Sequence, residues 1–306
     1  MAIRDLLNNY YYGKQGKGDF TLADLPKTRP ELFFTVLKVR WGQLVGLNLL
    51  YLVFWLPAIA WTALNLAALN SAALSGQEGL SGIVATWLLL LAPCIAVTGP
   101  FNAGITYVLR NWARDEHSFV WSDFWQAVRN NWKQALAVSC ISGAMPVLLY
   151  VSVTFYGGRV RAMPVFIVPI ALVILVALLW FLAEMLMMPM LVTYELRLRD
   201  IIRNSVLLTL GKLPFAVLFR LITLVLPALA LTVMALAPQA QVYALLILSG
   251  LYLLIVPAFN KLVTASYANW LCETYLNPRI EGARTNIGLR PENWDDVEYR
   301  PEDDEE

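Results

Sequence analysis

The stretch PVFIVPIALVILVALLWFLAEMLMMPMLVT, residues 164–193, holds 30 residues and a single charged side chain, Glu184. A helix needs about 20 predominantly apolar residues to cross the hydrocarbon core of a bilayer. The stretch lacks the two-residue alternation of a barrel strand, and backbone groups in lipid must be hydrogen-bonded within the segment. The sequence therefore predicts a transmembrane helix at this position.

Five other apolar runs have the same character. The six predicted spans are 42–69, 83–109, 135–156, 164–193, 213–236 and 242–270. A chain with 58% apolar and 15% charged residues is typical of a membrane protein rather than a soluble one. We therefore expect an all-α membrane protein with six transmembrane helices in three helical hairpins. The predicted domains are a cytoplasmic tail (1–30), the membrane domain (31–270) and an acidic cytoplasmic tail (271–306).

Positive charge is distributed unevenly along the chain. All but four of the 23 lysines and arginines lie in the tails or in the segments that follow the second and fourth spans. The exceptions are Arg159 and Arg161 in the turn after the third span, and Arg220 and Lys261 inside spans. The positive-inside rule therefore predicts a multi-pass protein of the bacterial cytoplasmic membrane with both termini in the cytoplasm. We expect the acidic tail to be solvated and largely disordered.

A short amphipathic stretch precedes each outward-going span. In the clearest of them, 121–132, five apolar side chains recur at helical spacing: Trp121, Phe124, Trp125, Val128 and Trp132. Similar patterns occur at 32–41 and 199–206. Such patterns predict cytoplasmic helices that lie along the membrane interface. Each hairpin is therefore expected to begin with an interfacial helix.

Two inward-going spans also share a residue pattern. Phe101, Asn102, Thr106, Asn111 and Trp112 match Phe259, Asn260, Thr264, Asn269 and Trp270 at identical spacing. This match favours a parallel repeat of the hairpin unit. Every predicted span contains proline, and these prolines either kink helices without further function or line a cavity.

One segment resembles a known family. GPFNAGITYVLRNWARDEHSFVWSDFWQAVRNNWKQA, residues 99–135, contains a Gly-Pro, an Asp-Glu pair, a Trp-Ser-Asp-Phe and an Asn-Trp-Lys in that order. It resembles the hallmark region of the YesL family of bacterial integral membrane proteins. The resemblance implies a polytopic membrane protein that is associated with carbohydrate uptake systems of the ATP-binding-cassette type, and it implies no catalytic residues.

Polar residues gather where the second span meets the cytoplasm. We interpret this cluster as a candidate docking surface for a cytoplasmic partner, formed by Arg114, Asp115, Glu116, His117, Trp121, Asp123 and Trp125. A second interpretation is purely structural, with arginines that anchor the span and carboxylates that balance them. The single histidine among carboxylates lacks a known metal-ligand spacing, so no metal site is predicted.

Charged and amide side chains also occur inside the spans. Ionised groups at the centre of a bilayer are costly, so they usually face a bundle interior or a water-filled path. We predict an intramembrane polar belt formed by Asn102, Glu184, Arg220, Asn260 and Lys261, with Glu184 within reach of Arg220 or Lys261. The alternative is that the two cations snorkel to the interface and Glu184 is protonated.

Function is less constrained than fold. With one histidine in the chain, no nucleophile–base arrangement is evident, and we expect no enzyme activity, no cofactor and no nucleic-acid partner. The expected partners are the lipid bilayer and, through the resemblance, subunits of a sugar uptake transporter. The leading hypothesis is an accessory or regulatory partner of that system, and the alternative is a small-solute transporter or channel.

Overall fold

The computed structural model describes residues 25–76, 79–237, 239 and 241–290. Those residues form helices and turns, and no strand occurs among them. The helices are α2 (Arg29–Val39), α3 (Trp41–Leu74), α4 (Leu80–Trp112), α5 (Val120–Gly157), α6 (Ile167–Thr193), α7 (Leu198–Gly211), α8 (Leu213–Leu236), α9 (Gln241–Leu254) and α10 (Val256–Tyr275), with short 3-10 turns η2 (Pro164–Phe166) and η4 (Asn277–Arg279). The N-terminal segment 1–24 and the acidic end 291–306 lie outside the described residues.

Five helices are long and apolar enough to cross a membrane, and α9 and α10 together make a sixth if the pair is counted as one span. This confirms an all-helical protein with several candidate spans. The continuous sixth helix expected over 242–270 is wrong, because α9 and α10 are bent by 59° at Ile255. The pair forms either a broken span or a re-entrant loop.

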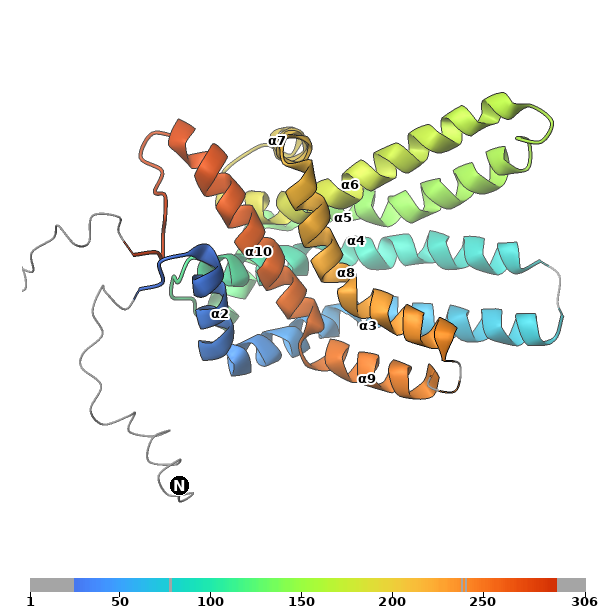
Figure 1. Cartoon of the computed structure of the whole chain (residues 1–306), viewed down its shortest axis with the longest axis horizontal. Coiled ribbons are helices and arrows are strands. Elements are labelled where there is room, and N and C mark those ends of the chain that lie inside the picture. Colours follow the sequence, from blue (N-terminus) through green and yellow to red (C-terminus); the bar gives the residue numbers. More distant parts are fainter. Residues whose placement is uncertain (1–24, 77–78, 238, 240, 291–306) are drawn as a thin grey trace, which may run out of the picture.

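α3 packs against α4, α5 against α6 and α8 against α9, and these helix hairpins point away from the end of the molecule at which α2 lies (Figure 1). The buried core lies toward that end. In α6, for example, the buried residues begin at Leu182 and continue to Leu191, while apolar side chains from Ile167 to Leu178 are exposed. The outer halves of the hairpins therefore present apolar surface, as lipid-facing helices do.

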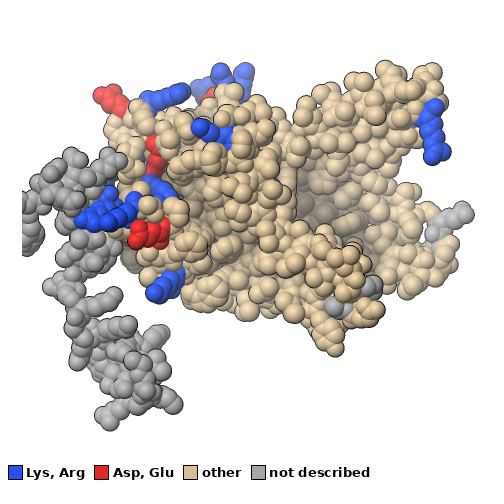
Figure 2. Space-filling view, viewed as in Figure 1, with Lys and Arg blue, Asp and Glu red and all other residues tan. Residues whose placement is uncertain are grey.

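Charged side chains gather at the core end of the visible surface, and one basic group lies at a hairpin tip (Figure 2). Arg159 and Arg161 belong to the turn between α5 and α6 at such a tip. The same view shows the surface hollowed between the tips of the hairpins (Figure 2). The charge distribution gives the molecule a polar end and an apolar body.

Two of the three amphipathic stretches form separate helices, and the third does not. α2 ends at Val39 and α7 ends at Gly211, and in each case the next helix, α3 or α8, begins after a single residue. Residues 121–132 instead continue into the third span as one helix of 38 residues, α5. Glycine or proline lies near the first two junctions, at Gly42 and Pro214, but not between 121 and 135, so nothing in the sequence interrupts the helix there. The expected separate interfacial helix before the third span is therefore wrong.

Glycines allow α4 and α5 to pack closely. A Cβ added to Gly99 would lie 2.5 Å from the carbonyl oxygen of Ala135, and one added to Gly143 would lie 2.6 Å from that of Ala92. Only glycine allows backbones to approach this closely in a membrane helix pair. The Gly-Pro of the family-like segment therefore has a packing role at Gly99.

The C-terminal boundary differs from the expectation as well. α10 continues to Tyr275, and residues 276–290 fold back over the polar end instead of leaving as a solvated tail. Glu273 is 6% exposed and forms an ion pair with Arg29 at the start of α2. Glu273 also accepts a hydrogen bond from the backbone N–H of Asn286, at 2.9 Å. One buried carboxylate thus joins the two described ends of the chain.

Candidate functional site

A cavity of about 250 Å³ lies among the membrane-spanning helices, with most of its wall formed by α6, α8 and α10. Eight of its lining residues are polar or charged, namely Thr106, Glu184, Arg220, Thr223, Tyr252, Asn260, Lys261 and Thr264. The other six are Phe181, Met185, Met188, Pro189, Leu224 and Pro227. Polar side chains are costly in the interior of a bilayer, so their convergence on one cavity points to a functional site.

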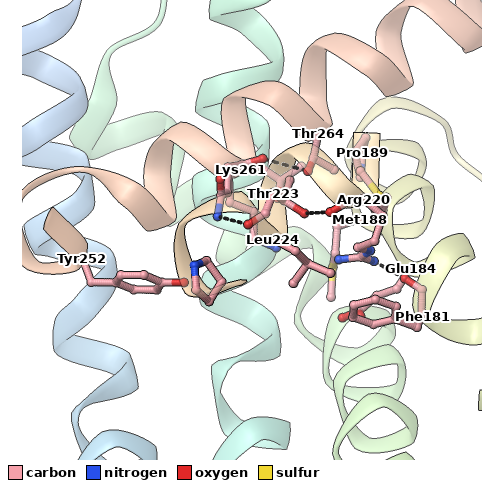
Figure 3. Close-up of a pocket in the computed structure, with 14 residues that line it drawn as sticks. Phe181, Glu184, Met188, Pro189, Arg220, Thr223, Leu224, Tyr252, Lys261 and Thr264 are labelled. Carbon is pink, nitrogen blue, oxygen red and sulfur yellow. Dashed lines mark hydrogen bonds between the residues drawn. The ribbon is translucent and has the colours of Figure 1, made fainter. Parts of the chain in front are cut away.

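Arg220 is held against α6. Its guanidinium donates a hydrogen bond to the backbone carbonyl of Phe181, and its Cζ lies 4.0 Å from the centre of the Phe181 ring. Glu184 lies beside Arg220, one turn further along α6 (Figure 3). The Nε atom of Arg220 is buried and has no hydrogen-bond partner in the described part of the chain. The guanidinium is therefore fixed in place with a donor still available.

Lys261 forms another part of the same wall. Glu184 is close enough to act electrostatically on both Lys261 and Arg220. None of the ion pairs among the described residues joins Glu184 directly to either cation. The three groups carry, formally, two positive charges and one negative charge around a shared space. The excess positive charge around this space would be stabilised by a further negative charge, because an uncompensated buried ion is unstable.

The break between α9 and α10 shapes the cavity. Pro257 has no N–H, and its ring pushes away the carbonyl of Leu253, four residues earlier. The side chain of Asn48 on α3 donates to the carbonyls of Tyr252 and Leu253, at 3.1 and 2.8 Å. It also accepts from the N–H of Ala258, at 2.9 Å. The backbone groups freed by the break thus have hydrogen-bond partners. Tyr252, before the break, and Asn260, after it, both lie on the cavity wall.

One hydrogen bond joins α10 to α8, from the Asn260 side chain to the carbonyl of Thr223 at 3.2 Å. Within α10, the Thr264 hydroxyl donates to the carbonyl of Asn260 at 2.8 Å. Tyr252 lies across the cavity from the Arg220 side (Figure 3). The wall therefore offers hydroxyl groups as well as charges to any bound solute.

Four of the five residues of the predicted polar belt line this cavity. The fifth, Asn102, is buried one turn from Thr106 and accepts a hydrogen bond from the Tyr51 hydroxyl at 2.7 Å. Sequence reasoning missed Thr223 and Tyr252, because hydroxyl residues are common in membrane helices and carry no distinct signal. Thr106 and Thr264 could have been found from the sequence, because they occupy matched positions in the two inward-going spans.

The candidate docking residues occupy the polar end, between α4 and α5. Arg114 and Glu116 form an ion pair at 4.0 Å, and His117 packs edge-on against Phe119 with ring centres 4.6 Å apart. Asp115 has a positive φ of 56°, a conformation that aspartate and asparagine tolerate better than most residues. Partial burial raises the pKa of the Asp115 carboxyl, and the charge of Arg40 opposes that rise.

Other members of this set have structural partners. Asp123 accepts hydrogen bonds from the Ser118 hydroxyl at 2.7 Å and from the N–H of Phe119 at 2.9 Å, so it caps the start of α5. Trp125 packs edge-on against Phe101, at 6.1 Å between ring centres. Trp121 is 65% exposed. Asp115, His117 and Trp121 are thus exposed, whereas Asp123 and Trp125 contribute to packing.

Comparisons with known proteins identify one family. Residues 44–153 match the model of a family described as "Protein of unknown function, DUF624". This segment covers most of α3, all of α4 and most of α5, and it includes Asn48 and Gly99. Glu184, Arg220 and Lys261 lie beyond it. No curated protein and no solved structure matches the chain.

Proposed function

We propose that this protein is a small-solute transporter or channel, and that the cavity between α6, α8 and α10 is its solute site. The observation that carries the proposal is the convergence of Glu184, Arg220 and Lys261 on a cavity at the break of a membrane-spanning helix. Broken helices in transporters supply substrate and ion sites near the centre of the bilayer, because irregular backbone is tolerated there only beside a cavity.

The charges of the wall favour an anionic solute. Two cations face one carboxylate, and the available donors include the Nε of Arg220 and the hydroxyls of Thr106 and Tyr252. A carboxylate or phosphate group would pair with Arg220 and Lys261, since charge-assisted hydrogen bonds are stronger than neutral ones. Glu184 then stabilises the two cations when no solute is bound.

Reconstituted vesicles test this function directly. Proteoliposomes of the full chain are placed in iso-osmotic potassium lactate or gluconate with valinomycin, so that potassium can accompany the anion, and swelling is followed by light scattering. We expect faster swelling with the wild type than with Lys261→Met, and no acceleration when the potassium salt is that of an impermeant polyanion. Lys212→Met is the matched control, because Lys212 lies at the start of α8 and outside the cavity. Equal rates for the wild type and empty vesicles would contradict the proposal.

A second candidate is the accessory role in a carbohydrate uptake system. It rests on the resemblance to the YesL family, which we propose as the finer identity of the DUF624 segment. One observation favours a docking surface: Phe119 and Trp121 are 70% and 65% exposed beside exposed Asp115 and His117. We place this surface and both termini in the cytoplasm of a bacterial cell, because of the distribution of lysine and arginine.

Co-purification from the native membrane tests the accessory role. We expect Glu116→Lys and Trp121→Ala to lose a transporter partner that the wild type retains, with thermal stability nearly unchanged, because exposed side chains contribute little to folding. Asp123 is unsuitable for this test because it caps α5. Recovery of the same partner with every variant would remove the docking surface.

A further inference from the structure

A second and much smaller cavity lies one helical turn from the first, toward the polar end of the molecule. It has a volume of about 10 Å³ and is bounded by α4, α6 and α10. Pro189 lines both cavities. Pro189 and Thr264 lie at the same end of the larger cavity (Figure 3). Arg110 follows Thr106 by four residues, and Ala268 follows Thr264 by four, which corresponds to about 6 Å along each helix.

The small cavity is rich in unpaired donors. Arg110 lines it from α4 and Arg114 from the turn that follows, and the Nε atoms of both are buried without a hydrogen-bond partner in the described part of the chain. Asn269 lines it from α10, is 8% exposed, and its Nδ2 has no partner either. Buried donors are normally satisfied, so three of them around one space indicate a missing acceptor.

The nearby carboxylates do not supply that acceptor. Glu116 lies 4.0 Å from Arg114, with its side chain 40% exposed. Glu273 is engaged through its Oε2 by Arg29 and by the N–H of Asn286, and its buried Oε1 accepts no hydrogen bond from Arg110, Arg114 or Asn269 among the described residues. Arg110 makes no ion pair with any described residue, and its guanidinium lies 4.9 Å from the centre of the Tyr107 ring. Two guanidinium groups therefore share one small space, and among the described residues only Glu116 lies within ion-pair distance of either of them.

We propose that this cavity binds one small inorganic anion of the size of chloride, held between the guanidinium groups of Arg110 and Arg114 and the side-chain amide of Asn269. The volume admits about one water-sized species. A phosphate group or a carboxylic acid is larger than that. The proposal rests on the donors of this small cavity alone and does not require that the larger cavity bind a solute.

The position of the site suggests how it relates to the larger cavity. Thr106 and Arg110 lie one turn apart on one face of α4, Arg114 follows in the turn after α4, and each carries a buried polar atom without a partner in the described part of the chain. Residues at this spacing are stacked along a helix. If the larger cavity transports an anion, as proposed above, this face of α4 forms its route to the polar end, with the small site as a step on that route.

Chloride-dependent stability tests the site. Thermal unfolding of the purified full chain is measured in increasing sodium chloride and in sodium methanesulfonate at the same ionic strength, since methanesulfonate is too large for the cavity. We expect a saturable rise in Tm with chloride alone, as binding to the folded state requires. Arg110→Gln should weaken the apparent chloride affinity by about tenfold or more, through the loss of a charge-assisted contact.

Three further variants make the result specific. Asn269→Asp places a carboxylate among the guanidinium groups, so it should fold and should lose the chloride response. Arg129→Gln changes an exposed arginine of α5 and should respond to chloride as the wild type does. Arg220→Gln alters only the larger cavity and should also keep the response, which separates the two proposals.

Crystals of the wild type grown in bromide locate the site without any variant. The proposal predicts an anomalous peak between Arg110 and Arg114. An unchanged Tm in chloride together with the absence of that peak would mean that water alone fills the cavity, and the proposal would be wrong. An equal chloride response in Asn269→Asp and the wild type would place the anion elsewhere and would equally overturn it.

Discussion

The side-chain oxygen of Asn48 accepts the backbone N–H of Ala258 at 2.9 Å, while its Nδ2 donates to the carbonyls of Tyr252 and Leu253. A single amide on α3 thereby satisfies backbone groups on both sides of the break between α9 and α10. Because water is not available to replace these bonds inside a bilayer, the bent shape of the last span depends on Asn48. The same bend brings Tyr252, Asn260 and Lys261 onto one cavity.

Removing this side chain should be strongly destabilising. Asn48→Ala leaves three buried backbone groups without partners, at a cost of about 1–3 kcal/mol for each group. We expect the free energy of unfolding in detergent to fall by about 3 kcal/mol or more. Asn65→Ala is the matched control, because Asn65 is also buried on α3 but donates only to the carbonyl of Trp61 in its own helix. Similar losses for both variants would show that Asn48 has no special role.

The close contact of α4 and α5 predicts a second sensitive position. Gly99→Ala would place a methyl group 2.5 Å from the carbonyl oxygen of Ala135, which is backbone and cannot rotate away. We expect a loss of about 1–3 kcal/mol, typical of an overpacked core. Gly46→Ala should be neutral or slightly stabilising, since nothing lies within 4 Å of its added Cβ and alanine favours a helix. Chemical unfolding in mixed micelles measures both, and a tolerated Gly99→Ala would contradict the close packing.

Asp115 predicts a pH-dependent effect. Burial raises the pKa of its carboxyl, so the folded protein holds this proton more tightly than the unfolded chain does. The contribution of Asp115 to stability is therefore present at low pH and is lost as the pH rises through the window between the ordinary pKa, about 3.9, and the raised one. We expect Asp115→Asn to show no gain in Tm below that window and a gain above it. If the gain in Tm of Asp115→Asn decreased as the pH rose, the pKa of Asp115 would not be raised by burial, and the prediction would be wrong.

The apolar runs predicted the helices because hydropathy depends only on local composition. The positions at which helices break depend on contacts that are distant in the sequence. Pro257 alone is compatible with a gentle kink, and the sharp bend requires Asn48, which lies 210 residues before Ala258 in the chain. α5 is continuous for a local reason, because neither glycine nor proline occurs between 121 and 135. The amphipathic pattern at 121–132 instead suggested a separate helix.

The cavity was accessible to sequence reasoning in part. Charged side chains in spans are rare enough to be noticed, and a similar distance from the span ends is the basis for predicting that Glu184, Arg220 and Lys261 come together. Depth does not reveal rotation about the helix axis, so Asn102 was grouped with them although it faces Tyr51. The donors of the small cavity were not predicted, since Arg110 and Arg114 fit the ordinary pattern of arginines at a cytoplasmic span end. Whether either cavity binds a solute stays a prediction.

The central claim is that the larger cavity is open to water and attracts anions, and a pair of cysteines on α8 tests it. Thr223 lines the cavity, whereas Val225 on the same helix is 56% exposed on the lipid-facing surface. Each is changed to cysteine in a chain whose native cysteines, Cys94, Cys140 and Cys272, are replaced by alanine. Rates of reaction in membranes are measured with sulfonatoethyl and trimethylammonioethyl methanethiosulfonates, each normalised to its rate with free mercaptoethanol.

The account predicts that Thr223→Cys reacts, that Val225→Cys does not, and that the normalised rate at residue 223 is higher for the anionic reagent. Adding Lys261→Met to Thr223→Cys should remove most of that preference, because it removes one of the two cations of the wall. Failure of Thr223→Cys to react, or a preference for the cationic reagent, would contradict the claim that this cavity is a water-accessible anion site.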